Sequence, residues 1–254
     1  MKFLVTVSTD VGILKETNQD SCLVKHISTK IGEILLAVVC DGMGGLSKGE
    51  LASATVVRAF SHWFNEELPY EIENLELNII GEKWSLLLKD LNSQIIDYSG
   101  KHNIQSMGTT FTAVLFINGQ YLIGHVGDSR IYKIESNVSQ LTTDHTFVAR
   151  EIAKGTMTLE QAKTDKRRNL LLQCIGASKN VTPQIIIGEA SKGTYLICSD
   201  GFRHEITENE MLHFLSPNKL SNKKSMQKNV DYLINQIKNR GERDNISAIL
   251  IKAY

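Results

Sequence analysis

Apolar residues along this chain fall into short runs and alternating patterns that predict mainly β-strands. Residues 33–40 are apolar on both faces, which predicts a strand covered on both sides. Two apolar runs, 110–117 and 120–126, flank Asn118-Gly119, and this dipeptide between apolar runs is a strong signal of a β-hairpin. Further strands are expected at the amphipathic start of the chain, residues 1–10, and at residues 129–134, 193–199 and 246–253.

Three blocks place apolar residues at the spacing of a helical face, which predicts helices packed on the core. They span residues 47–67, 83–99 and 226–239, and Ser47 is a candidate N-cap of the first. Residues 68–82 fit neither pattern clearly, and we assign them only the role of linking two helices. The chain is therefore expected to form a sheet-rich sandwich flanked by long helices.

Composition limits the class of protein. Hydrophobic residues make up 42% of the chain, enough for a sizeable core. The 28 basic residues balance the 28 acidic ones, whereas nucleic-acid binding usually shows a basic excess, so we expect no nucleic-acid partner. No stretch approaches the ~20 apolar residues of a membrane span, and we expect no membrane association. Because the chain has only three prolines and no Gly/Ser-rich linker, residues 1–254 are expected to form a single domain.

The cysteines indicate the redox compartment. Cys22, Cys40, Cys174 and Cys198 form no CxxC pair, and each stands among apolar residues. This pattern is typical of reduced, buried thiols and predicts a cytoplasmic protein. The ligand spacing of a structural zinc site is absent from the sequence.

Several apolar strands end or begin at an aspartate. Any single such residue is adequately explained as a turn former, because Asp and Asn favour turns. Five in one domain indicate more, since the strand ends of a sheet lie near one another and can bring carboxylates together. The five residues are Asp20, Asp41, Asp128, Asp200 and Asp244.

Converging carboxylates require cations between them, because otherwise their mutual repulsion would force some of them to protonate. Oxygen ligands select hard cations, here Mg²⁺ or Mn²⁺. A glycine follows both Asp41 and Asp200, and it lets the backbone approach closely enough for its carbonyl to join the ligands. Two such ions about 3.5–4 Å apart support in-line hydrolysis of a phosphate ester by a water that bridges them. The residues therefore predict a metal-dependent phosphatase.

These aspartates belong to short motifs that resemble those of the metal-dependent protein phosphatases of type 2C, especially the compact bacterial ones. The motifs occur in the same order and extend along nearly the whole chain. Each motif is weak alone, and the shared order makes the resemblance specific. The motifs are Thr9-Asp10-Val11-Gly12 with Asn18-Gln19-Asp20, Asp41-Gly42-Met43-Gly44-Gly45, Gly108-Thr109-Thr110, Gly127-Asp128-Ser129-Arg130-Ile131-Tyr132, Leu141-Thr142-Thr143-Asp144-His145, Arg168-Asn169-Leu170, Ser199-Asp200-Gly201 and Asp244-Asn245-Ile246-Ser247.

The resemblance implies an α+β fold, a four-layer αββα sandwich in which two antiparallel β-sheets are flanked by helix pairs. It implies an enzyme that hydrolyses phosphoserine and phosphothreonine in proteins with two Mn²⁺ or Mg²⁺ ions. The stretch from about 145 to 172 matches a mobile flap beside the site that influences substrate choice.

The resemblance also implies roles for single residues. Asp41 would bridge the two ions, and Asp128 would hold a third, weaker one. The remaining ligands would be divided between the two ions: Asp200 and Asp244 for the first, and the Gly42 carbonyl and, through water, Asp20 for the second.

The sequence departs from the family pattern at three positions. Lys15 stands where the family has a phosphate-binding arginine, and a lysine pairs with phosphate only as a point charge. We assign Lys15 to the substrate phosphate, with a solvated surface lysine as the alternative. Gln19 stands where some members have a carboxylate, so more of the ligands of the second ion would be water molecules. Met43 replaces a candidate general-acid histidine of some eukaryotic members.

Two other functions stay open. The departures at Lys15 and Gln19 would suit a degenerate module that binds phosphoprotein without turnover, and some relatives are regulatory phosphatases of a single partner. The main expectation is a monomeric enzyme that acts on phosphorylated proteins, among them a serine/threonine kinase or its substrates.

Three histidines lie near the motifs. We interpret His125 as sheet packing, His145 as part of the flap and His204 as a surface residue. Because His204 follows Asp200 closely, a role in proton transfer is its alternative.

Overall fold

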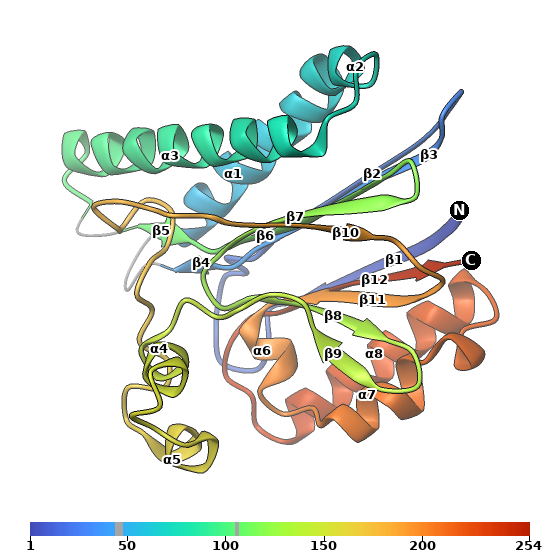
Figure 1. Ribbon diagram of the computed structural model, residues 1–254. Coiled ribbons are helices and arrows are strands. Elements are labelled where there is room, and N and C mark those ends of the chain that lie inside the picture. The colour runs from blue at the N-terminus through green and yellow to red at the C-terminus, as the bar shows by residue number, and fades with distance from the viewer. Residues whose placement is uncertain (44–47, 105–106) are drawn as a thin grey trace.

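The computed structural model describes residues 1–43, 48–104 and 107–254, which form two stacked antiparallel β-sheets (Figure 1). One sheet contains, in spatial order, β1 (Phe3–Asp10), β12 (Ile246–Ala253), β11 (Gly193–Cys198), β8 (Arg130–Ile134) and β9 (Val138–Gln140). The other contains β10 (Gln184–Glu189), β7 (Gln120–Val126), β6 (Phe111–Ile117), β3 (Gly32–Cys40) and β2 (Ser21–Thr29). A short ribbon pairs β4 (Gly42–Met43) with β5 (Gly108–Thr109).

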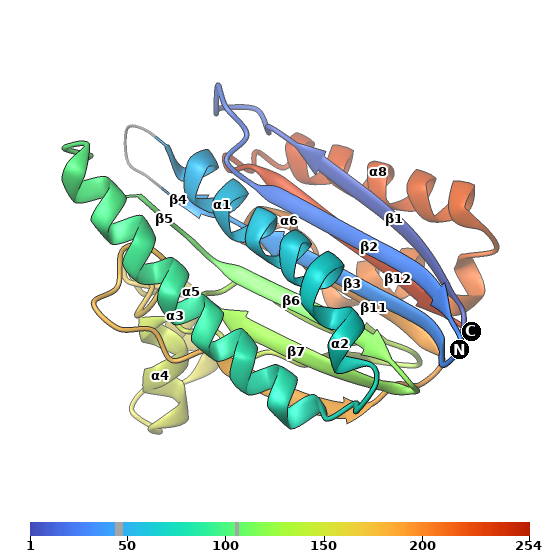
Figure 2. The same cartoon turned by 90° about the horizontal axis from the view of Figure 1, so that it is seen from above.

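Helices cover the outer face of each sheet. Figure 2 shows α1 (Gly49–His62) and α3 (Leu77–Lys101) lying across the sheet that contains β3 and β6. α7 (Glu208–Leu215) and α8 (Lys223–Asn239) cover the sheet that contains β1 and β12. The predicted α+β, four-layer αββα sandwich is therefore confirmed.

Shorter helices connect these elements. None of the helices in the described part of the chain has the length and apolar content that a bilayer crossing demands. The short helices are the π-helix η1 (Trp63–Glu67), α2 (Leu68–Glu71), α4 (Phe147–Ala153), α5 (Leu159–Thr164), α6 (Asp200–Arg203) and the 3-10 helix η2 (Pro217–Lys219).

Strand β3 shows why a strand can be apolar on both faces. Leu35 and Val39 pack against the other sheet, whereas Leu36 and Val38 pack under the helices. All four side chains are fully buried. The strand prediction for residues 33–40 is confirmed, and its carboxyl end is held rigidly from two sides.

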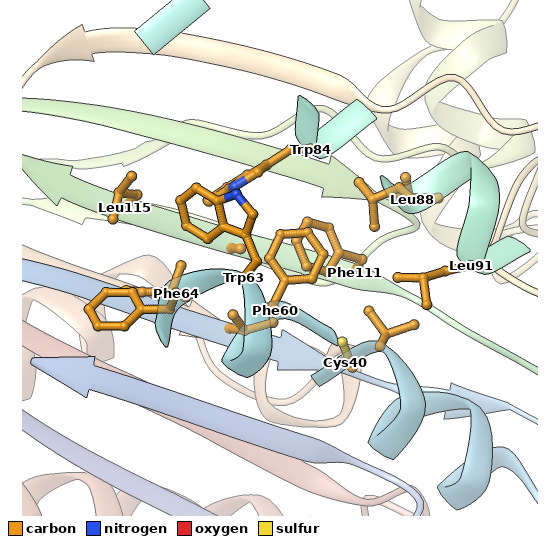
Figure 3. Packing of buried hydrophobic residues seen from close by; sticks show 14 of the residues in the cluster. Cys40, Phe60, Trp63, Phe64, Trp84, Leu88, Leu91, Phe111 and Leu115 are labelled. Atoms are coloured by element: carbon orange, nitrogen blue, oxygen red, sulfur yellow. The ribbon is translucent and has the colours of Figure 1, made fainter. Parts of the chain in front are cut away.

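An aromatic cluster fixes the helices to this sheet (Figure 3). The Phe60 ring of α1 lies 4.3 Å from Phe111 of β6 and 5.2 Å from Trp84 of α3, measured between ring centroids. Trp63 and Trp84 meet edge to face at 5.3 Å, a favourable arrangement for aromatic rings. These contacts hold α1, α3 and the central strands as one layer.

The hairpin predicted around Asn118-Gly119 is also confirmed, since this dipeptide joins β6 to β7. Asn118 has φ 48° and Gly119 has φ 75°. Positive φ at both turn residues matches the tight turn type that follows the twist of the two strands.

The helices differ from prediction mainly at their ends. α1 begins at Gly49, and the candidate cap Ser47 lies outside the described residues, as do Gly44 and Gly45 of the motif. Residues 68–82 are more than a linker, because they contain α2 and the first turns of α3. Pro69 lies in the first turn of α2. The backbone N–H that proline lacks would have no partner within the helix at this position.

The four cysteines are free thiols. Cys40, Cys174 and Cys198 are buried, and Cys22 is half-buried. Burial raises the pKa of the Cys198 thiol to about 12, which keeps it protonated and unreactive.

Candidate metal centre

The register of β2 and β3 brings the first two aspartates together. Ser21 pairs with Cys40, so Asp20 precedes one strand at the point where Asp41 follows the other. The Asp41 carbonyl accepts a hydrogen bond from the Thr110 N–H at 2.8 Å, and the Asp41 N–H donates to Thr110 Oγ1 at 2.9 Å. The backbone of Asp41 is therefore fixed to the start of β6.

The other sheet brings the remaining aspartates to the same end of the sandwich. Cys198 of β11 pairs with Arg130 of β8 and with Ala248 of β12. Asp200 therefore follows β11 where Asp128 precedes β8 and Asp244 precedes β12. In Figure 1 this end, marked by β4, β5 and α6, lies away from the chain termini.

The carboxylates lie near enough for their charges to affect one another's pKa. Burial, followed by the charges of Asp20 and Asp200, raises the pKa of Asp41 well above its ordinary value. Burial raises the pKa of Asp20 to about 7, and the charges of Asp200 and Asp244 add to this effect. Mutual repulsion of this kind is what a cation would relieve.

Several carboxylate oxygens at this end of the sandwich have no hydrogen-bond partner within the described part of the chain, as expected for a site that binds a cation. Among the described residues, both carboxylate oxygens of Asp20 and Oδ1 of Asp200 are buried without a hydrogen-bond partner. Hydroxyls of Ser199 and Ser247 lie close enough to lower the pKa of Asp20, but neither reaches hydrogen-bond geometry with its oxygens. Buried oxygen atoms without partners are costly, and a divalent cation would satisfy them.

Close backbone packing explains the glycine of the Asp-Gly pair at Asp41. A Cβ atom on Gly42 would lie 2.4 Å from the carbonyl oxygens of both Gln19 and Gly49. Only a glycine fits there, and it draws β4 against the loop before β2 and the start of α1. The proposed role of the Gly42 carbonyl as a ligand remains a prediction.

The side chains alone do not form a complete cation site. Within residues 1–43, 48–104 and 107–254, no group of three or more His, Cys, Asp or Glu side chains is arranged to hold a metal ion. The fit to a cation therefore rests on the unpaired oxygens and on the chemistry of the carboxylates. The individual ligand assignments stay predictions.

Lys15 lies at the site but in contact with a predicted ligand. Its Nζ is 3.1 Å from Asp244 Oδ1, and both side chains are 41% exposed. The placement of Lys15 beside the carboxylates agrees with a role near the substrate. Its role in binding phosphate is untested by this contact.

Gln19 contacts Glu50 and Asn245. Its Nε2 donates to Glu50 Oε2 of α1 at 3.2 Å, while its backbone N–H donates to Asn245 Oδ1 at 2.9 Å. The Asn245 side chain also donates to the carbonyls of Val11 and Thr17. In the sequence Asn245 stands out only as part of a motif, and its structural role is to tie the loop before β2 to β12.

Asp128 is engaged by an arginine that the sequence analysis did not single out. Arg203 Nη2 donates to Asp128 Oδ2 at 3.1 Å. Asp144 Oδ2 lies 3.8 Å from the same nitrogen and accepts a hydrogen bond from Arg130 Nη2 at 2.7 Å. Burial, followed by the charge of Asp200, raises the pKa of Asp128 to about 6. No sequence signal links Arg203 to Asp128, because only the β8–β11 register brings them together.

The position of His125 agrees with its interpretation as sheet packing, whereas the role of His145 in a flap stays a prediction. His125 is buried in β7, with Nδ1 2.9 Å from Thr112 Oγ1. His145 Nδ1 accepts the Gly127 N–H at 3.2 Å at the base of the flap. His204 is exposed directly after α6, and its Nε2 lies 3.7 Å from Asp200 Oδ2.

The segment predicted as a flap leaves the sandwich beside this site. Thr146 and Leu171 form an isolated bridge at its base, and the Phe147 N–H donates to the Leu170 carbonyl at 2.9 Å. Helices α4 and α5 lie beyond this base (Figure 1). A cavity of about 270 Å³ separates them from α6, and Asp144 and Arg203 line it together with residues of both flap helices.

Comparisons with known proteins agree on one family. The sequence model of the family described as Protein phosphatase 2C matches residues 14–251. The serine/threonine phosphatase stp of Listeria welshimeri is 30% identical over 248 residues, which cover 96% of this chain and 93% of that protein.

Solved structures show the same likeness. The serine/threonine phosphatase Stp1 from Staphylococcus aureus has a TM-score of 0.85 at 29% identity, covering 100% of this chain and 96% of that one. The catalytic domain of the phosphatase PstP in complex with 2 manganese ions has a TM-score of 0.79 at 27% identity, covering 98% and 97%.

Proposed function

This chain belongs to the protein phosphatase 2C family and is a serine/threonine protein phosphatase, and from that premise we propose how its residues divide the work. The observation that supports the division is the set of unpaired, buried oxygens on Asp20 and Asp200. They lie at the strand ends next to Asp41, and the charges of Asp20 and Asp200 raise the pKa of Asp41. Residues 1–254 would act as one catalytic domain, with 145–172 as its flap.

The metal ligands are proposed as follows. Asp41 would bridge two cations, and the other groups would complete them: Asp200 and Asp244 on the first, the Gly42 carbonyl and, through water, Asp20 on the second. Because these donors are all oxygen atoms, the ions would be Mn²⁺ or Mg²⁺. When bound, they would lower the pKa of water at the site and neutralise charge on the substrate phosphate.

The protein's own residues would position the substrate. Lys15 would hold the phosphate as a point charge from the exposed loop between β1 and β2. Asn245 would keep that loop in place through its hydrogen bonds to Val11, Thr17 and Gln19.

The substrates would be phosphorylated proteins, among them a serine/threonine kinase or its targets. The equal numbers of basic and acidic residues support a protein rather than a nucleic-acid partner. We further propose a location in the cytoplasm, supported by the four free thiols, and a monomeric state.

Phosphate release from a phosphothreonine peptide, measured while Mn²⁺ is titrated into metal-free protein, tests this assignment. Release should appear with Mn²⁺, disappear with EDTA, and be absent from Asp41→Asn and Asp200→Asn at any Mn²⁺ concentration. Activity that survives EDTA and both substitutions would contradict the metal mechanism. Peptide binding without phosphate release in the wild type would instead support a degenerate binding module.

A further inference from the structure

We propose that Arg203 supplies to Asp128 the positive charge that a third cation would otherwise supply, so that the centre takes up two divalent cations and no third. This inference rests on the proposed function, because it concerns the same carboxylate site. It revises the role that the family resemblance implies for Asp128.

Arg203 contacts Asp128 through two of its nitrogen atoms. Arg203 Nη2 donates to Asp128 Oδ2 at 3.1 Å, and Arg203 Nε donates to the Asp128 carbonyl at 3.3 Å. The guanidinium therefore occupies a side-chain and a main-chain oxygen of the same residue. The two side chains are only 12% and 8% exposed, so water screens the pair weakly.

The backbone around Arg203 is held in place. α6 starts at Asp200 directly after β11, which puts Arg203 about one helical turn beyond that aspartate. A Cβ atom on Gly201 would lie 2.2 Å from the Asn245 carbonyl, and Phe202 is fully buried. The guanidinium therefore has a fixed base from which to reach Asp128.

Neighbouring charges support the same assignment. Arg203 also faces Asp144 at 3.8 Å, and Asp144 accepts hydrogen bonds from Arg130 Nε at 2.8 Å and from Arg130 Nη2 at 2.7 Å. Arg203 and Arg130 thus lie against Asp128 and Asp144, and the carboxylate of Asp200 adds a further negative charge near Asp128. A divalent cation added at Asp128 would face the charge of Arg203 at close range, and repulsion in a poorly screened site is strong.

Binding stoichiometry tests the proposal without relying on activity. Isothermal titration of Mn²⁺ into metal-free protein should give two ions for the wild type and two for Asp128→Asn. Arg203→Gln, which removes the charge but keeps a polar side chain, should gain a third, weaker site. That site should be lost again in Arg203→Gln combined with Asp128→Asn.

Two further variants distinguish the loss of the positive charge at position 203 from a general effect of substituting an arginine. Arg203→Lys keeps a positive charge and should bind two ions. Arg150→Gln removes an exposed arginine of the flap helix α4 and should also bind two. If Arg203→Gln does not fold, the comparison of the wild type with Asp128→Asn decides: equal uptake of two ions supports the proposal, and loss of one ion in the variant overturns it.

Other outcomes have distinct meanings. Three ions in the wild type, with the third lost in Asp128→Asn, would overturn this inference and leave the proposed function intact. An unchanged count of two in folded Arg203→Gln would also overturn it. A wild type that takes up no Mn²⁺ at all would overturn the proposed function together with this inference.

Discussion

Lys15 Nζ lies 3.1 Å from Asp244 Oδ1, so the residue that we assign to the substrate phosphate contacts a residue that we assign to a metal ion. Both side chains are 41% exposed, and ion pairs with this exposure contribute only about 0–1 kcal/mol to stability. A cation bound at Asp244 would therefore displace the lysine at little cost. The released ammonium group would then be available to a phosphate.

Substitution of Lys15 should change substrate capture more than turnover. Lys15→Ala should raise KM for a phosphothreonine peptide roughly tenfold, equivalent to about 1.4 kcal/mol, because one charged contact is lost. Lys15→Arg should lower KM, since a guanidinium can grip a phosphate with two parallel hydrogen bonds. Steady-state kinetics at saturating Mn²⁺ would measure both, with Lys89→Ala on the outer helix α3 as control. Equal KM values in all four proteins would exclude Lys15 from phosphate binding.

Removal of the Asp20 charge should stabilise the metal-free protein. Burial and the neighbouring Asp200 and Asp244 disfavour the ionised form, so Asp20→Asn in EDTA should increase the free energy of unfolding at neutral pH by roughly 1–3 kcal/mol. The same variant should gain less stability from Mn²⁺ than the wild type does. Urea denaturation with and without Mn²⁺ would measure this, and Asp97→Asn on the exposed face of α3 provides the control. A loss of stability in EDTA would contradict the proposed repulsion.

The difference in unfolding free energy between Asp20→Asn and the wild type should depend on pH. The pKa of Asp20 is raised from 3.8 to about 7, so the folded state holds this proton more tightly than the unfolded state. The contribution of Asp20 to stability therefore falls as pH rises from about 4 to about 7, at up to about 1.4 kcal/mol per pH unit. Asp20→Asn lacks this dependence. In EDTA its advantage over the wild type should be small near pH 4 and largest above pH 7, and a difference independent of pH would rule out this origin.

Gly42 should tolerate no side chain. In Gly42→Ala the new Cβ would meet the carbonyl oxygens of Gln19 and Gly49 at 2.4 Å, which forces β4 away from its neighbours. We expect phosphatase activity to fall more than about tenfold and Mn²⁺ to stabilise the variant less. Gly100→Ala in α3 is a matched control, because nothing lies within 4 Å of its Cβ position, and it should gain about 0.5–1 kcal/mol of stability. Melting curves and assays that show the two variants alike would contradict the close packing at Gly42.

Local patterns were sufficient to predict much of the fold. Residues 33–40 and the Asn118-Gly119 hairpin carry their signal within a few positions, and the structure agrees with both. α7 escaped detection although Thr207 and Glu210 form a capping box at its start, a signal that the sequence does contain. Edge strand β10 has no comparable signal, since its place is set by pairing with β7.

Some residues of the site could also be recognised from local sequence patterns, and others could not. Aspartates at strand ends could be recognised because Asp20 and Asp41 each adjoin an apolar run. The partners of Lys15 and Asp128 could not, because each pair joins residues distant in sequence through strand register. The family motifs assign a position to Asp128, whereas its contact with Arg203 is visible only in the folded arrangement.

Strand β1 pairs with β12 along its full length, from Phe3 opposite Ala253 to Asp10 opposite Ile246. The carboxylate site needs Asp20 from the region after β1 and Asp244 from the region before β12, so its parts are separated by most of the polypeptide. Contacts of such long sequence separation are slow to form, because the entropy of closing a long loop opposes them. A chain still emerging from the ribosome would therefore lack a working site until β12 has been synthesised and has paired with β1. Competence to remove phosphate is in this way tied to the synthesis of β12.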